Sequence, residues 1–142
     1  MSQDAYEAIQ EKRLKPWKGE EEVRYIWMKV IEDATGLHLN AERGRKDSSH
    51  NHVIIEFKAP GLFRGKKDSP GFKNATEERL LPYIQCESAK TGIPESDFIG
   101  IAIDGEHICF AQVHGDQIHT QHLIPFSTYA VDLVIDAFVS DT

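Results

Sequence analysis

The segment Val53–Phe57 constrains the fold of this chain more than any other. Its residues are apolar or β-branched except for Glu56, and Pro60 and Gly61 end the run. A short apolar run bounded by turn residues is typical of a central strand that is covered on both faces. A carboxylate inside such a strand costs free energy unless it has partners. The presence of Glu56 therefore needs an explanation.

The chain has 142 residues, 40% of them hydrophobic, which allows one domain with a real core and is too short for two. We expect a single domain over 1–142, with a lead-in over 1–19, a core over 20–113 and a C-terminal extension over 114–142. The sequence has no apolar stretch of the length a membrane span needs, and its N-terminus lacks the apolar block of a secretory signal. It therefore predicts a soluble, cytoplasmic protein without a membrane partner.

Hydrophobic periodicity and turn residues predict the order of the elements. An amphipathic helix over 20–35 closes at Gly36, and an Asp104-Gly105 turn joins two strands. The full prediction is a short helix within 1–19, helix 20–35, strand 37–43, a strand end and turn over 47–51, strand 53–57, a mobile loop over 62–74, helix 75–91 in which Pro82 implies a kink or a later start, strands 98–103 and 107–113, a connection, and helix 127–138. This order favours an α/β sandwich with a mixed central sheet flanked by helices.

Asp47, Glu56 and Lys58 form the candidate site. Side chains alternate along a strand, so Glu56 and Lys58 share one face, with α-carbons about 6.6 Å apart. If the turn centres near Asn51 and His52, Asp47 stands almost opposite Glu56, with β-carbons about 5 Å apart. Two carboxylates held this close repel, and a divalent cation such as Mg²⁺ relieves the repulsion while keeping positions for water and phosphate. The pattern predicts a hydrolytic metal site.

GRKD (Gly44–Asp47) followed by VIIEFK (Val53–Lys58) resembles the D…ExK motif of the PD-(D/E)XK nuclease superfamily, and the likeness in element order covers about 19–113. The resemblance implies a restriction-endonuclease-like three-layer sandwich with an α-β-β-β-α-β core. It also implies a Mg²⁺-dependent deoxyribonuclease, with Mn²⁺ as a substitute, in which Asp47, Glu56 and Lys58 are catalytic.

In many relatives a glutamate that opens the preceding helix joins the metal site. The stretch GEEEVR (Gly19–Arg24) offers three candidates. We favour Glu20 as the third metal ligand beside Asp47 and Glu56, with Glu22 second, because Glu20 shares the apolar face of the helix.

The resemblance implies a DNA endonuclease like the N-terminal nuclease domains of type I and type II restriction enzymes, working within a restriction-modification system. It implies DNA as the substrate, a methyltransferase or target-recognition region as a partner, and leaves a homodimer open. Arg64, Lys66 and Lys67 are candidates for contacts with the DNA backbone. An ordinary flexible surface loop explains these three residues equally well.

Other readings stay open beside the nuclease. The formal net charge of −7 argues against a protein that coats nucleic acid by general electrostatics. The chain could be a non-catalytic module that binds nucleic acid or protein on a nuclease fold, or a small-molecule regulatory domain. Glu56 and Lys58 would then be a surface ion pair on a half-exposed strand, and Asp47 a turn residue.

Cysteines and histidines offer no second site. Cys86 and Cys109 lack a CxxC spacing, and we expect both to be reduced and partly buried. His114, His119 and His122 are crowded in the sequence but match no known zinc spacing. We expect His119 and His122 to lie in a connection without a rigid element to orient them.

Overall fold

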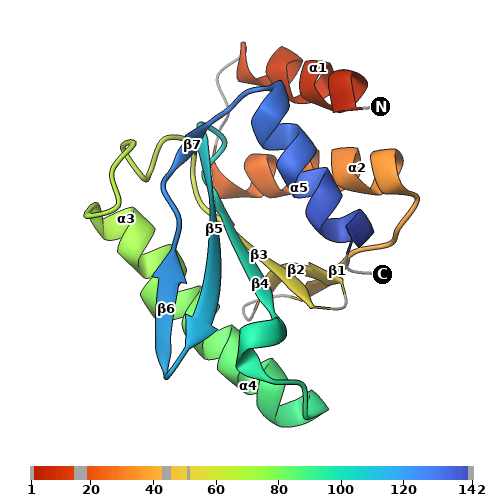
Figure 1. Ribbon diagram of the computed structural model, residues 1–142. Coiled ribbons are helices and arrows are strands. Elements are labelled where there is room, and N and C mark those ends of the chain that lie inside the picture. Colours follow the sequence, from red (N-terminus) through yellow and green to blue (C-terminus); the bar gives the residue numbers. More distant parts are fainter. Residues whose placement is uncertain (1, 15–18, 43–45, 51, 141–142) are drawn as a thin grey trace.

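A mixed β-sheet with helices on both of its faces makes up the protein (Figure 1). The computed structural model describes residues 2–14, 19–42, 46–50 and 52–140, and it describes side chains over 3–14, 19–39 and 52–139. Figure 1 shows α1, α2 and α5 on one side of the sheet and α3 and α4 on the other. This is the α/β sandwich with flanking helices that the sequence predicts.

The described residues contain seven strands in one sheet, in the spatial order β1-β2-β3-β4-β5-β6, with β7 paired to β5. Their bounds are β1 (Asn40–Glu42), β2 (Lys46–His50), β3 (Val53–Phe57), β4 (Ile99–Ile103), β5 (His107–His114), β6 (Gln117–Thr120) and β7 (Ile124–Pro125). Only β3 and β4 are parallel; the other pairs are antiparallel. A parallel pair needs a long crossover, and the helices between β3 and β4 supply it.

The helical elements form two layers. Their bounds are α1 (Ser2–Arg13), α2 (Glu20–Thr35), α3 (Pro70–Lys73), the π-helix η1 (Asn74–Leu80), α4 (Leu81–Thr91), the 3₁₀ turn η2 (Glu95–Asp97) and α5 (Thr128–Ser140). The first and last helices belong to the same layer as α2 and share its apolar cluster. The lead-in and the C-terminal extension are therefore parts of one core.

Alternation along β3 divides the core into two apolar clusters. Val53, Ile55 and Phe57 pack with α1, α2 and α5, whereas Ile54 packs with the helices between β3 and β4. All five residues of β3 are buried. Because side chains alternate, Glu56 points to the same face as Ile54. The acidic residue of the central strand thus lies under the η1–α4 layer.

Most predicted elements are confirmed, with shifted ends. α2, β3, the β4–β5 hairpin and α5 lie where the sequence places them, and the Ser127 hydroxyl caps α5 by accepting from the Ala130 amide at 3.1 Å. Gly36 and Gly92 end their helices at φ angles of 74° and 77°. This left-handed conformation is open to glycine without steric cost. The strand expected over 37–43 is shorter, spanning Asn40–Glu42.

Two predictions for the second half are wrong. The segment 62–74 is not simply a mobile loop, because Phe63, Ser69 and Phe72 are buried and the helical layer already begins at Pro70. Ser69 caps this start by accepting from the Phe72 amide. The connection after His114 contains the strands β6 and β7. In the described residues, no helix has the length and apolar character to cross a membrane.

Candidate active site

Glu56 and Lys58 form a buried ion pair at the end of β3. Lys58 Nζ lies 3.3 Å from Glu56 Oε2, and the side chains are 12% and 2% exposed. The prediction that both point the same way is confirmed. The alternative, a surface ion pair on a half-exposed strand, is wrong, because a carboxylate this deeply buried has lost nearly all contact with water. Such a group is costly unless it is charge-paired.

The register of β2 and β3 places Asp47 opposite Glu56 along the backbone. Ser48, Ser49 and His50 pair with Ile55, Ile54 and Val53. This is the register that the sequence predicts, and one further step along both strands aligns Asp47 with Glu56. The Asp47 side chain lies outside the described side chains. Its part in the site stays a prediction that the register supports.

Arg79 and Asn74 complete the cluster, and the sequence does not predict either. Arg79 Nε lies 3.5 Å from Glu56 Oε2, on the same oxygen that Lys58 contacts. Lys58 Nζ donates a hydrogen bond of 2.5 Å to Asn74 Oδ1. The guanidinium of Arg79 also lies over the ring of Tyr83, 5.2 Å from its centroid. One buried carboxylate oxygen therefore has two cations beside it.

The π-helix explains how Asn74 and Arg79 reach the same place. Residues five apart on an α-helix are about 140° apart around the axis, so they face different ways. In η1 the hydrogen bonds run from residue i+5 to residue i, as from the Leu81 amide to the Thr76 carbonyl, and residues five apart return to one side. Pro82 follows at the start of α4, where its ring would clash with a tightly wound preceding turn. The α-helix itself begins only at Leu81, which is the later start that Pro82 implies as the alternative to a kink.

Glu20 and Glu56 belong to opposite sides of the sheet. Glu20 opens α2, which packs against the opposite face of the sheet, and its carboxylate pairs with Arg24 Nη2 at 3.0 Å. Acidic residues in a first helical turn also favour the positive end of the helix dipole. The role of Glu20 as a third metal ligand stays a prediction, and so does the alternative role of Glu22.

Arg64, Lys66 and Lys67 are exposed on the segment that leaves β3. Lys67 Nζ donates to the Thr120 carbonyl at 3.1 Å, which ties this segment to β6. Glycines at 61 and 65 and Arg64 itself adopt positive φ angles, so the segment is a series of tight turns. Its basic side chains are available to a polyanion, and contact with DNA stays a prediction.

Asp104 binds the start of the segment that carries Arg64, Lys66 and Lys67. It is fully buried at the end of β4 and accepts hydrogen bonds from the Phe63, Glu106 and His107 amides at 2.8–2.9 Å. Burial raises the pKa of Asp104 above its ordinary value, against the lowering effect of these amides and of the charge on His107. Asp104 therefore holds the turn between β4 and β5 and the start of the basic segment together.

This carboxyl should make stability depend on pH. Because its pKa is higher in the fold than in the unfolded chain, the stability it contributes is present below the unfolded value and is lost as pH rises through the folded value. In Asp104→Asn this loss should be absent, and the variant should be about 1–3 kcal/mol less stable, since its amide group would face the Phe63 amide. Urea unfolding of both proteins between pH 4 and 8 measures the difference. Parallel pH profiles would contradict it.

The side chains around Glu56 suit a divalent cation such as Mg²⁺ only if Asp47 is one of its ligands. Among the residues whose side chains are described, no three His, Cys, Asp or Glu groups gather. Glu56 supplies one buried carboxylate, and continuing the strand register by one step puts Asp47 opposite it. Carboxylate oxygens are the ligands Mg²⁺ prefers. Asp47 and Glu56 would supply two protein carboxylates to such a site, and the remaining metal positions would go to water and phosphate.

Thiols and imidazoles lie elsewhere. Both cysteines are free, Cys86 half-buried and Cys109 buried, and burial raises the pKa of Cys109 to about 11. His119 lies on β6, so the expectation that it has no rigid support is wrong, because its strand pairs with β5. Its ring lies 5.6 Å from that of His114. His122 lies in the connection, as predicted.

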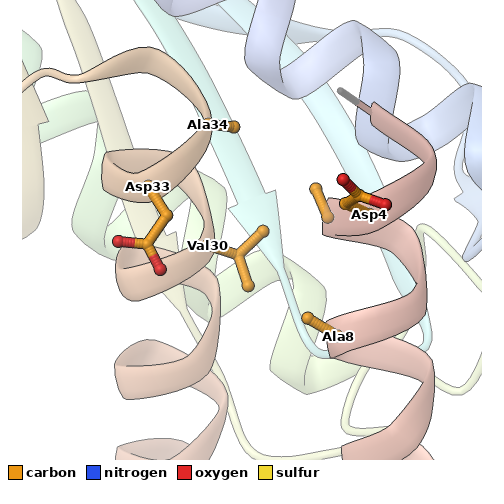
Figure 2. Close-up of a pocket in the computed structure, with 6 residues that line it drawn as sticks. Asp4, Ala8, Val30, Asp33 and Ala34 are labelled. Atoms are coloured by element: carbon orange, nitrogen blue, oxygen red, sulfur yellow. The ribbon is translucent and has the colours of Figure 1, made fainter.

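A hollow of about 280 Å³ between α1 and α2 holds no site residue. Figure 2 shows Val30 directed toward Ala8, while the carboxylates of Asp4 and Asp33 do not point toward each other. Its remaining lining is made of alanine side chains, which supply no polar group. This hollow therefore offers no chemistry.

Comparisons of the chain with family models, with curated proteins and with solved structures found no match. The chemistry of the charged cluster must therefore be inferred from its own geometry.

Proposed function

We propose that this domain is a metal-dependent nuclease of the PD-(D/E)XK type that hydrolyses phosphodiester bonds in DNA. The observation that carries the proposal is the buried Glu56–Lys58 pair on a central strand, with Asp47 opposite Glu56 in the strand register. Folding alone gives little reason to bury these charges, because an ion pair in a protein interior is often no more stable than apolar residues of similar size.

The arrangement of the elements supports the proposal. The chain runs α2, β1, β2, β3, the α3–α4 segment and β4, which is the α-β-β-β-α-β order of a restriction-endonuclease-like core. Glu56 and Lys58 lie where β3 and β4 end side by side, since the Lys58 amide still donates to the Ile103 carbonyl at 2.8 Å. Strand ends on a rigid sheet hold catalytic groups more precisely than free loops do.

The roles of the residues follow from their chemistry. Asp47 and Glu56 would hold Mg²⁺, with Mn²⁺ as a substitute. A bound divalent ion polarises a phosphate and lowers the pKa of a water it carries. Lys58 is held by Asn74 and is placed to donate to the attacking water or to a phosphate oxygen, where its charge offsets the negative charge of the transition state.

The substrate and the biological setting belong to the same proposal. DNA is favoured because Arg64, Lys66 and Lys67 are exposed on the segment that links Lys58 to the π-helix. The exposed basic residues of this segment offer contacts to phosphates in a chain whose formal net charge is −7. A role in a restriction-modification system, with target recognition supplied by another region, and pairing of two copies to cut both strands, would complete the function.

Cleavage of supercoiled plasmid tests the proposal. The wild type should convert it to nicked circles in Mg²⁺ or Mn²⁺ and leave it intact in a chelator. A folded wild type that leaves the plasmid intact in both metals would contradict a self-sufficient nuclease. Binding of DNA without cleavage would instead favour the non-catalytic module.

A further inference from the structure

Arg79 contacts the same carboxylate oxygen of Glu56 that Lys58 contacts. Its Nε lies 3.5 Å from Glu56 Oε2, whereas Lys58 Nζ lies 3.3 Å from the same atom. The closest contact is made by Nε, whereas arginine binds carboxylates and phosphates most strongly through two nitrogens at once. At 3.5 Å it is longer than a good hydrogen bond. Arg79 is thus attached to Glu56 by charge more than by geometry.

Lys58 and Arg79 differ in how firmly they are held. Lys58 is 12% exposed and is fixed by its hydrogen bond to Asn74. Arg79 is 36% exposed and, in the described part of the chain, rests between Glu56 and the ring of Tyr83. An aromatic face holds a guanidinium without fixing its direction. Of the two cations, Arg79 is the one that can turn away at little cost.

A divalent cation at Glu56 would lie within a few ångströms of both cations. Like charges at this separation in a partly buried site repel strongly, which weakens metal binding by roughly tenfold or more unless one of them moves. A substrate phosphate offers the charge that draws a displaced guanidinium.

We propose that Arg79 is a displaceable counter-ion of Glu56. It neutralises the buried carboxylate in the metal-free protein and turns to a substrate phosphate when a divalent cation takes its place. This inference rests on the proposed nuclease function and assigns to Arg79 a coupling between metal binding and substrate binding.

The test is Arg79→Gln, with Lys90→Gln as the matched control. Lys90 is an exposed lysine in the last turn of α4, far along the chain from the cluster. Calorimetric titration with Mn²⁺ should show binding to Arg79→Gln that is roughly tenfold tighter than to the wild type. Plasmid cleavage by the same variant should fall at least tenfold, because a phosphate contact is lost. Arg79→Lys keeps the charge and should leave Mn²⁺ affinity close to the wild type.

The predicted changes in Mn²⁺ affinity and in cleavage rate have opposite signs, and this separates the counter-ion role from a structural one. A residue that merely supports the fold would, when replaced, weaken metal binding and cleavage together. If the wild type binds Mn²⁺ and Arg79→Gln binds it no more tightly, the counter-ion role is overturned while the nuclease function stands. Tighter Mn²⁺ binding with unchanged cleavage overturns the phosphate contact. Tighter binding by the variant with no cleavage by the wild type keeps the counter-ion role and removes the nuclease function; no Mn²⁺ binding by either protein overturns both.

Discussion

Lys58→Met should lower the rate of metal-dependent plasmid cleavage by roughly 10²–10³-fold, the range seen when one preorganised donor to a developing charge is removed. Methionine keeps the apolar length of the lysine stem and removes only the ammonium group. Glu56 keeps Arg79 as a charge partner, so the fold should lose only about 1 kcal/mol. The effect on catalysis should therefore far exceed the effect on stability.

Lys90→Met is the control for this result, since it removes a lysine charge from an exposed position on α4. Both variants are compared at equal folded fraction, measured by circular dichroism. Cleavage by Lys58→Met within threefold of the wild type would remove Lys58 from the catalytic group. An equal loss in the control would indicate a general charge effect on DNA binding.

A double-mutant cycle on Glu56 and Lys58 should show strong coupling. Glu56→Leu leaves the ammonium of Lys58, 12% exposed, and the guanidinium of Arg79 without their carboxylate, and should cost about 3 kcal/mol. The double variant Glu56→Leu with Lys58→Met should lie within about 1 kcal/mol of the wild type, because buried ion pairs exchange for apolar groups at little cost. Urea unfolding of the four proteins then gives a coupling of roughly 3 kcal/mol.

This cycle also separates a functional cluster from a structural one. If the Glu56–Lys58 pair serves catalysis, the double variant folds well and does not cleave plasmid. Glu77→Leu, a change at an exposed glutamate of η1, controls for the general effect of adding a leucine. A double variant several kcal/mol less stable than the wild type would mean that the fold itself needs the charges, and the case for a catalytic site would weaken.

The central strand and its site could be predicted because their signals are local. Four apolar residues and one acid predict a buried strand whichever residues cover it, and alternation alone places Glu56 and Lys58 on one face. The register with β2 depends on one short polar segment, and the observed pairing of His50 with Val53 is the one that this segment predicts. Gly36 and Gly92 likewise end helices through their own backbone freedom.

The contacts that η1 makes with Glu56 and Lys58 could not be predicted, because they depend on π-helical winding, which hydrophobic periodicity does not reveal. At α-helical spacing Arg79 is an ordinary solvated position, and only the π-helix brings it beside Glu56 together with Asn74 at Lys58. Ser69 followed by Pro70 is typical of a helix start, but the glycines and lysines before it favour a loop. β6 has only four residues, two of them Gln117 and His119, so its pattern is too short and polar to detect.

The most direct measurement is nicking of supercoiled plasmid in Mg²⁺ and in a chelator, by the wild type and by Asp47→Ala and Lys58→Ala at matched folding. We predict nicked circles only for the wild type and only with metal. This result would establish the metal-dependent site and would include Asp47, whose side chain the structure does not describe. Wild-type protein that leaves the plasmid intact, or variants that nick as fast as the wild type, would contradict the assignment of Asp47, Glu56 and Lys58 as a nuclease centre.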